Sequence, residues 1–194
     1  MNSNQYRSLE SLREITWLTE QGVQEEQINP PMQSWLLEKG LLTKRLRSLC
    51  GTHFRLEVLH GPTAGWDSLT LANSSIATYE FKREVVMWCG EEPCIYAQTN
   101  VSESTANMHP WLRTLGAEPL GERLQSLADV TRSDFAFACV EACDSDIYPL
   151  GRLSITGPLW ARRSTFTIRS HELIVIEVFL PGLLACGNRY KEHR

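Results

Sequence analysis

Two segments near the C-terminal end have strand character and lie too close together to be joined by a helix. Residues 160–169 and 172–180 are separated only by a tight turn near Ser170-His171. Parallel strands need a crossover of about a dozen residues or more, so these two segments are expected to pair antiparallel. Residues 77–89 and 94–101 form a second such pair, with a connection of four residues. These short connections therefore predict an antiparallel sheet and not a doubly wound parallel sheet.

Helical spacing of apolar residues occurs in two other parts of the chain. Residues 32–49 predict two helices with a turn at Gly40, and residues 103–128 predict two more. Strand-like alternation at 54–59 and a further strand at 135–141 complete the pattern. The order helices, strands, helices, strands favours an α+β domain, with a single antiparallel β-sheet and the helices packed on one face.

The length of 194 residues predicts one domain, for which we expect the bounds 29–185. Residues 1–28 are an N-terminal extension with a weak apolar rhythm. They form either a short amphipathic helix on the edge of the domain or a loosely attached segment. Residues 186–194 are expected to be a C-terminal tail, and the protein is expected to be a monomer.

Charge and hydropathy argue against several kinds of partner. The net charge of −4 argues against nucleic acid, because phosphate binding normally requires a basic surplus. No stretch approaches the roughly 18 apolar residues of a membrane span. The first residues are polar and acidic, without the apolar core of a signal peptide. We expect a cytoplasmic protein, or one of the plastid stroma if its gene is plastid-encoded, with neither nucleic acid nor membrane as partner.

The cysteines and histidines do not follow a metal-binding pattern. The 6 cysteines are scattered and include no Cys-x-x-Cys pair, so reduced and mostly packed thiols are expected. The 5 histidines are dispersed as well. Motifs of the common hydrolases, NTPases and dinucleotide-binding enzymes are missing from the sequence. We expect no metal site.

Glu177 interrupts the most apolar segment of the chain. Strand alternation places it on one face with Val175 and Phe179, while Ile176 and Val178 lie on the other. If both faces are covered, Glu177 is a buried carboxylate that has to be paired or protonated, which is a signal of a functional site. The alternative is a glutamate on an edge strand that faces solvent.

Several cations and one helix start are candidates for binding an anion. Arg83 begins an apolar part of its predicted strand, and an inward arginine offers two parallel donors to a carboxylate. A surface arginine is the alternative. Leu120 follows a proline at a predicted helix start, where free N–H groups attract anions. Arg162 and Arg163 lie at a strand entrance, where they either meet a carboxylate or are solvated.

The same residues belong to a pattern that resembles the chorismate pyruvate-lyase family. The resemblance extends from about residue 30 to 183, in the family's order and at near-family spacing. Its motifs lie in five segments: residues 35–45, residues 83–85 with 90–93, residues 115–121, residues 159–164 and residues 177–181. The resemblance implies an antiparallel sheet with helical flaps over a buried ligand site. It also implies a lyase that is independent of cofactors and converts chorismate to 4-hydroxybenzoate and pyruvate, for ubiquinone or plastoquinone biosynthesis.

The resemblance also implies roles for individual residues. Arg83 matches the arginine that holds the ring carboxylate, and Glu177 matches the glutamate that contacts the hydroxyl at the far end of the ring. Leu42 and Leu120 match positions whose backbone groups line the ligand. These four residues are the expected substrate-binding set, with Arg83 and Glu177 as the catalytic pair.

One position departs from the family pattern. Gln98 stands where enterobacterial members carry an arginine, so the anchor of the enolpyruvyl carboxylate is open, with Lys44, Arg162 and Arg163 as candidates. An alternative function is a domain of the same fold that binds 4-hydroxybenzoate or a similar aromatic acid without turnover. A second alternative is an enzyme of the same fold that acts on another substrate.

Overall fold

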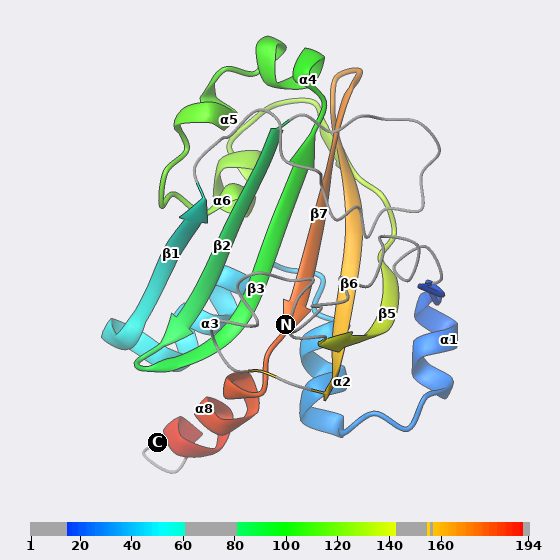
Figure 1. Cartoon of the computed structure of the whole chain (residues 1–194), viewed down its shortest axis with the longest axis vertical. Helices are drawn as coiled ribbons and strands as arrows, with labels where there is room; N and C mark the ends of the chain where they lie inside the picture. Colours follow the sequence, from blue (N-terminus) through cyan, green and yellow to red (C-terminus); the bar gives the residue numbers. More distant parts are fainter. Residues whose placement is uncertain (1–14, 61–80, 143–154, 156, 192–194) are drawn as a thin grey trace, which may run out of the picture.

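The computed structural model describes residues 15–60, 81–142, 155 and 157–191. In this part of the chain, strands form one sheet in the order β1-β2-β3-β7-β6-β4, and β5 also pairs with β6 (Figure 1). Every pairing is antiparallel. The strands are β1 (Phe54–His60), β2 (Phe81–Cys89), β3 (Glu92–Val101), β4 (Val130–Arg132), β5 (Ala136–Ala142), β6 (Gly157–Ile168) and β7 (His171–Phe179).

Short helices pack against this sheet, and none of those described is long and apolar enough to span a membrane. They are α1 (Glu20–Glu25), α2 (Pro30–Leu36), α3 (Leu42–Cys50), the 3-10 turn η2 (Gly51–His53), α4 (Glu103–Met108), α5 (Trp111–Thr114), α6 (Leu120–Gln125) and α8 (Gly182–Lys191). The α+β architecture with a single antiparallel sheet is confirmed.

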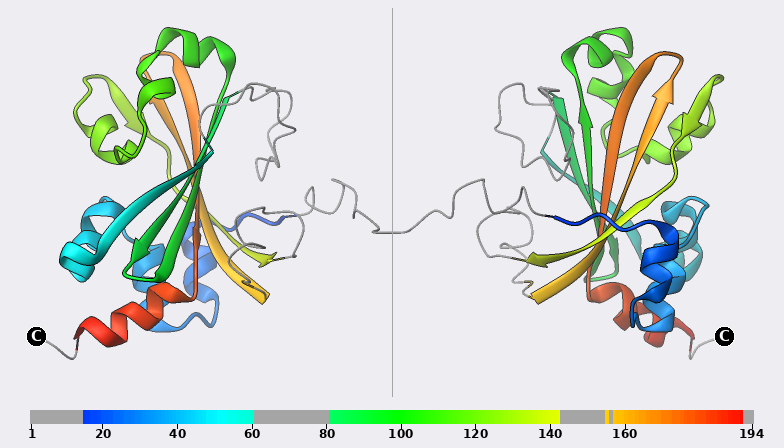
Figure 2. Two further views of the ribbon diagram at one scale, coloured as in Figure 1. Left: turned by 60° about the vertical axis from the view of Figure 1, so that its left-hand side comes forward. Right: turned by 90° about the vertical axis from the view of Figure 1, so that its right-hand side faces the viewer.

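Two groups of helices cover one face of the sheet at its two ends. Near one end, α2 and α3 pack on Val85, Met87 and Phe179. Near the other end, α4, α5 and α6 pack on Phe81 and Leu173. Strand alternation puts all five of these sheet residues on the same face. The two groups therefore leave a central strip of that face between them (Figure 2).

The opposite face of the sheet has its own buried cluster, which includes Val86, Tyr96 and Val178 and the chain before α1. That early segment pairs with the sheet, since Leu18 exchanges two backbone hydrogen bonds with Phe137, of 2.6 and 2.9 Å. Described residues before 29 thus pack on the domain, while residues 1–14 of the predicted extension lie outside the described residues.

The expected C-terminal boundary is different in the structure. Helix α8 runs through the boundary expected between residues 185 and 186, and it packs on β3 and α3. Leu183 and Cys186 are fully buried, because an apolar helix face contacts the ends of the strands. The expectation of a tail from residue 186 is therefore wrong for residues 186–191, and residues 192–194 lie outside the described part.

Cysteine bonding also departs from expectation. Cys50 and Cys89 form a disulfide that joins the end of α3 to the end of β2, so the expectation of reduced thiols is wrong for this pair. The two residues are 39 positions apart in sequence, and folding brings their Cα atoms to 5.5 Å. Cys94 and Cys186 are buried free thiols.

Candidate functional site

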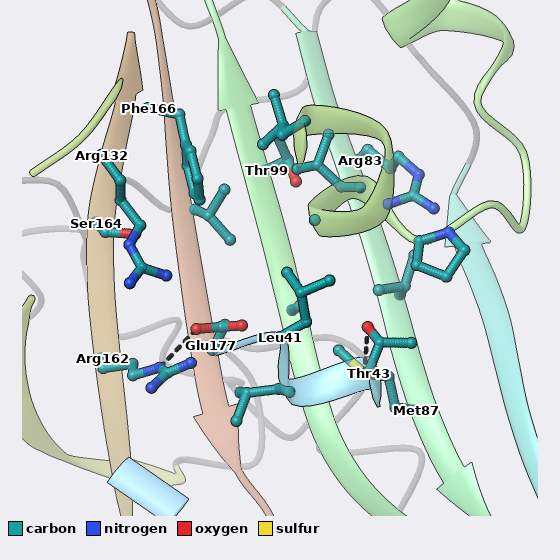
Figure 3. A pocket seen from close by; sticks show the side chains of 18 of the residues that line it. Leu41, Thr43, Arg83, Met87, Thr99, Arg132, Arg162, Ser164, Phe166 and Glu177 are labelled. Atoms are coloured by element: carbon teal, nitrogen blue, oxygen red, sulfur yellow. Dashed lines mark hydrogen bonds and ion pairs between the residues drawn. The ribbon is translucent and has the colours of Figure 1, made fainter. Parts of the chain in front are cut away.

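A pocket lies on the central strip of the sheet, beneath the start of α3 and the start of α6 (Figure 3). Alternate residues of β2, β3 and β7 form its apolar floor, namely Val85, Met87, Ala97 and Val175. Phe166 of β6 also lines it. Helices cover this face of the strands, and the second cluster covers the other face. The charged side chains of the pocket lie at its two ends, while Thr43, Thr99 and Ser164 add hydroxyls to its lining.

Arg83 lies at one end of the pocket and is 5% exposed. Its Nη2 donates to the carbonyl oxygens of Gly116 and Glu118, at 2.8 and 3.0 Å. Gly116 has a φ of +54°, a left-handed conformation that favours glycine and turns these carbonyls toward the arginine. Arg83 Nε is buried and has no hydrogen-bond partner among the described residues. This end of the pocket therefore offers an unused buried donor on a guanidinium group.

The charge of Arg83 is kept despite its burial. Burial lowers the pKa of its guanidinium to about 10, and the nearby Glu118 acts in the opposite direction. The group is therefore a cation at neutral pH. A buried cation held mainly by neutral carbonyls is a suitable site for a carboxylate, which would supply the missing negative charge.

Glu177 lies at the other end of the pocket and pairs with Arg162. The two residues face each other across β7 and β6, and Arg162 Nε donates to Glu177 Oε2 at 2.7 Å. Arg162 Nη1 also donates to the carbonyls of Leu36, the last residue of α2, and of Glu38. Arg162 is 1% exposed, so a buried ion pair holds the Glu177 carboxylate in place.

The register of the sheet sets the separation of the two ends. Arg83 pairs with Thr99, and Ala97 pairs with Glu177. Arg83 and Glu177 are thus on strands with one strand between them and are offset by two residues. Standard strand spacings place their Cα atoms about 12 Å apart. Both residues line the pocket, and the apolar floor lies between them.

Arg132, at the end of β4, is a further cation of the pocket that the sequence reasoning missed. Its Nη2 donates to the carbonyl oxygen of Lys39 at 2.8 Å, and its guanidinium lies 4.4 Å from the ring centre of Phe135. Burial and the nearby Arg162 lower the pKa of Arg132, while Glu177 raises it. Nothing in the segment Val130–Arg132 distinguishes this arginine from a surface residue.

Of the other predicted site residues, two line the pocket and two lie outside it. Leu42 and Leu120 both line the pocket, as the first residues of α3 and α6. Their N–H groups have no acceptor within the helix, since helical hydrogen bonding begins later. Lys44 is an exposed residue on α3 and does not line the pocket. Arg163 lies on the opposite face of β6, 4.2 Å from the ring of Trp17.

Gln98 also lies on the opposite face of the sheet. Its Nε2 donates to Asn100 at 2.7 Å, and its Oε1 accepts from Tyr96 at 3.2 Å. Strand alternation puts Gln98 away from the pocket because its neighbours Ala97 and Thr99 face it. The presence of Gln98 in place of the arginine of enterobacterial members therefore does not change the polar groups that line this pocket. Arg162 is the one member of the predicted set Lys44, Arg162 and Arg163 that lines the pocket.

Two segments meet above the pocket. A Cβ atom on Gly121 of α6 would lie 2.7 Å from Leu41 Cδ2, which precedes α3, so only glycine permits this approach without a shift of the leucine. Arg47 of α3 and Glu122 of α6 form an ion pair of 2.8 Å. Below them, Thr43 Oγ1 donates to Met87 Sδ at 3.8 Å. The starts of α3 and α6 thus form a roof that is held together by contacts between side chains.

Metal-ligating side chains are not clustered in the described part of the chain. No group of three His, Cys, Asp or Glu residues there is placed to hold a metal ion. The polar groups available to a ligand in this pocket are therefore guanidinium groups, one carboxylate, hydroxyls and backbone N–H groups.

Comparison with known proteins gives a consistent result. The family model of chorismate lyase matches residues 11–186. A probable chorismate pyruvate-lyase of Halorhodospira halophila is 33% identical over 156 residues, covering 78% of this chain and 82% of the relative. A protein of the same description from Ralstonia nicotianae is 36% identical over 165 residues, covering 77% and 80%.

Solved structures are more distantly similar. The effector domain of PhnF from Mycobacterium smegmatis has a TM-score of 0.49 and 13% sequence identity, over 75% of this chain and 91% of that domain. At this level the similarity carries no argument about function.

Proposed function

Since the chain belongs to the chorismate lyase family, we propose that its pocket eliminates pyruvate from chorismate and leaves 4-hydroxybenzoate. The observation that carries this proposal is the arrangement of charges at the two ends of an apolar pocket. Arg83 lies at one end, and Glu177 with Arg162 lies at the other. This arrangement suits a flat ring that carries a carboxylate at one end and a hydroxyl at the opposite end.

The chemistry requires positioning more than covalent assistance. The C4–H bond of chorismate breaks and its electron pair forms the C3–C4 double bond of the ring. The C3–O bond breaks in turn, and the leaving enolpyruvate takes up a proton and becomes pyruvate. Because the ring becomes aromatic, a site that fixes both groups and excludes water can accelerate the step through orientation and preorganised charge.

Each polar residue then has a defined role in this proposal. Arg83 binds the ring carboxylate, with additional donors from the backbone N–H groups of Leu42 and Leu120 at the two helix starts. Glu177 accepts a hydrogen bond from the C4 hydroxyl and orients the C4–H bond. Arg162 positions Glu177 through their 2.7 Å ion pair. The pocket floor of Val85 and Ala97 contacts the ring face.

Product release is expected to be slow in such a site. The roof of Leu41 and Gly121 has to open before the ring can leave, and both ends of 4-hydroxybenzoate are held. Strong product inhibition is therefore expected. We further propose that the product supplies the ring of a quinone, ubiquinone or plastoquinone, as the family resemblance implies.

Incubation of the purified protein with chorismate tests the proposal. Pyruvate and 4-hydroxybenzoate should appear in equal amounts, at a rate well above that of the uncatalysed reaction. Binding of 4-hydroxybenzoate without any turnover of chorismate would instead indicate a domain that only binds aromatic acids. An absence of both binding and turnover would favour another substrate.

A further inference from the structure

We propose that Arg132 binds the enolpyruvyl carboxylate of the substrate, the group that leaves as pyruvate. The inference deepens the proposed function and rests on it. It assigns a specificity-determining residue to the half of the substrate that the pair Arg83 and Glu177 does not explain.

The charged side chains that line the pocket do not balance one another. Its described lining contains three arginines and one carboxylate, namely Arg83, Arg132, Arg162 and Glu177. Glu177 is paired with Arg162 at 2.7 Å, which leaves two cations without a carboxylate partner in the lining. A substrate with two carboxylates would match these two cations, whereas a product with one carboxylate would match one of them.

Arg132 lies on the side of the pocket where the enolpyruvyl group would be. The enolpyruvyl ether is on C3, next to the C4 hydroxyl that Glu177 would contact. The second carboxylate must therefore lie near Glu177 and away from Arg83. Figure 3 shows the Arg132 side chain directed toward Glu177 and Arg162.

Arg132 uses fewer of its hydrogen-bond donors within the described part of the chain than Arg162 does. Arg162 uses Nε for Glu177 and Nη1 for two carbonyls. Arg132 makes one hydrogen bond in the described part of the chain, from Nη2 to the Lys39 carbonyl. Its remaining donors are available, and a guanidinium can bind a carboxylate through two parallel hydrogen bonds.

Two aromatic rings hold the guanidinium group of Arg132 in place. Arg132 pairs with Phe166 in the ladder between β4 and β6, and its guanidinium lies 4.4 and 5.9 Å from the ring centres of Phe135 and Phe166. Arg132 also lines a second hollow beside the pocket, together with Leu41 and Gly121. Arg132 is an exposed residue and therefore lies at the side of the site that faces solvent, where a leaving group can depart.

This assignment can be tested by comparing how tightly each variant binds a ligand with two carboxylates, chorismate, and a ligand with one, 4-hydroxybenzoate. Arg132→Gln should raise the KM for chorismate or lower kcat/KM by about 10- to 100-fold, the usual effect of losing a charge-assisted hydrogen bond. Its affinity for 4-hydroxybenzoate should stay within about twofold of the unchanged protein. Arg83→Gln should weaken both ligands, and Arg189→Gln, an exposed arginine on α8, should weaken neither.

If Arg132 serves only to bind the Lys39 carbonyl, a different result is expected. In that case Arg132→Gln would weaken chorismate and 4-hydroxybenzoate equally, and this outcome would overturn the proposal. Unchanged kinetics with chorismate would overturn it as well. Arg132→Lys keeps the charge and should restore part of the chorismate affinity, and thermal unfolding of each variant checks that the fold is intact.

A binding measurement separates this inference from the proposed function. The probe is a benzoate that carries an enolpyruvyl ether at its 3-position, which has both carboxylates and cannot react. The unchanged protein should bind it more tightly than benzoate, and Arg132→Gln should remove most of that preference. If the protein does not turn over chorismate, the proposed function fails, while this comparison still decides the role of Arg132.

Discussion

Arg162 donates from Nε to the Glu177 carboxylate over 2.7 Å, and the two residues are direct partners across β6 and β7. The pair fixes one oxygen of the carboxylate and leaves the other to face the pocket. Arg162 is in turn held by two carbonyls at and just after the end of α2. The orientation of Glu177 therefore depends on the sheet register and on the segment that precedes α3.

Glu177→Gln should lower kcat for chorismate by about 100-fold or more, as expected when a group that orients a reacting proton loses its charge. The glutamine carbonyl can still accept from Arg162, but the buried guanidinium loses its counter-charge, so the thermal unfolding temperature should also fall. Steady-state kinetics and a thermal scan on the same sample check both expectations. Full activity in Glu177→Gln would remove this residue from the mechanism.

Arg162→Met should destabilise the fold by about 3–5 kcal/mol, because it leaves the Glu177 carboxylate unpaired in a largely buried place. The carbonyls of Leu36 and Glu38 lose their donor as well. Urea unfolding measures this difference. The matched control is Arg189→Met, which removes an exposed ion pair to Glu92 and should cost less than about 1 kcal/mol. Equal losses in both variants would contradict the importance of the buried pair.

Arg83→Lys should make ligand binding depend on pH. Burial lowers the pKa of Arg83 to about 10, and the same burial would bring the pKa of a lysine from about 10.4 to about 8. Only the protonated amine attracts a carboxylate, so the variant should lose affinity as the pH rises through about 8. The unchanged protein should keep its affinity until about pH 10.

Calorimetry with benzoate between about pH 6 and 9 checks this expectation, since benzoate has no hydroxyl that ionises in the range. An affinity for benzoate that is equally independent of pH in both proteins would mean that residue 83 does not contact the carboxylate.

Arg47→Gln should speed product release. Arg47 and Glu122 join the two halves of the roof at 2.8 Å, with 47% and 37% of their side chains exposed. An exposed pair of this kind contributes less than about 1 kcal/mol, which corresponds to at most about fivefold in rate. Stopped-flow measurement of 4-hydroxybenzoate release should show an increase of about two- to fivefold. Arg189→Gln breaks a pair of similar exposure away from the roof, and an equal effect there would argue against the role of the roof.

The sequence identifies Glu177 on physical grounds because it is a charge within an apolar strand, and the alternation of Val175, Glu177 and Phe179 sets its face. The short connections of the strands likewise predict the antiparallel sheet. Arg83 carries no such signal, and its importance comes from the motif resemblance. Its burial depends on the carbonyls of Gly116 and Glu118, which are 33 and 35 residues away.

Arg132 and Arg163 show what the sequence alone does not determine. Arg162 and Arg163 are adjacent, and only the pairing with Glu177 decides which of them faces the pocket. Arg132 belongs to the pocket because β4 pairs with the end of β6 and because the Lys39 carbonyl, 93 residues away, binds it. These relationships arise from sheet register and long-range packing, which leave no local pattern in the sequence.

The most direct test of the account is the simultaneous measurement of pyruvate and 4-hydroxybenzoate from chorismate, with the unchanged protein and Glu177→Gln side by side. The account predicts equal amounts of the two products from the unchanged protein and a rate reduced by about 100-fold or more in the variant. Formation of neither product above the uncatalysed rate, in a protein that is folded, would contradict it.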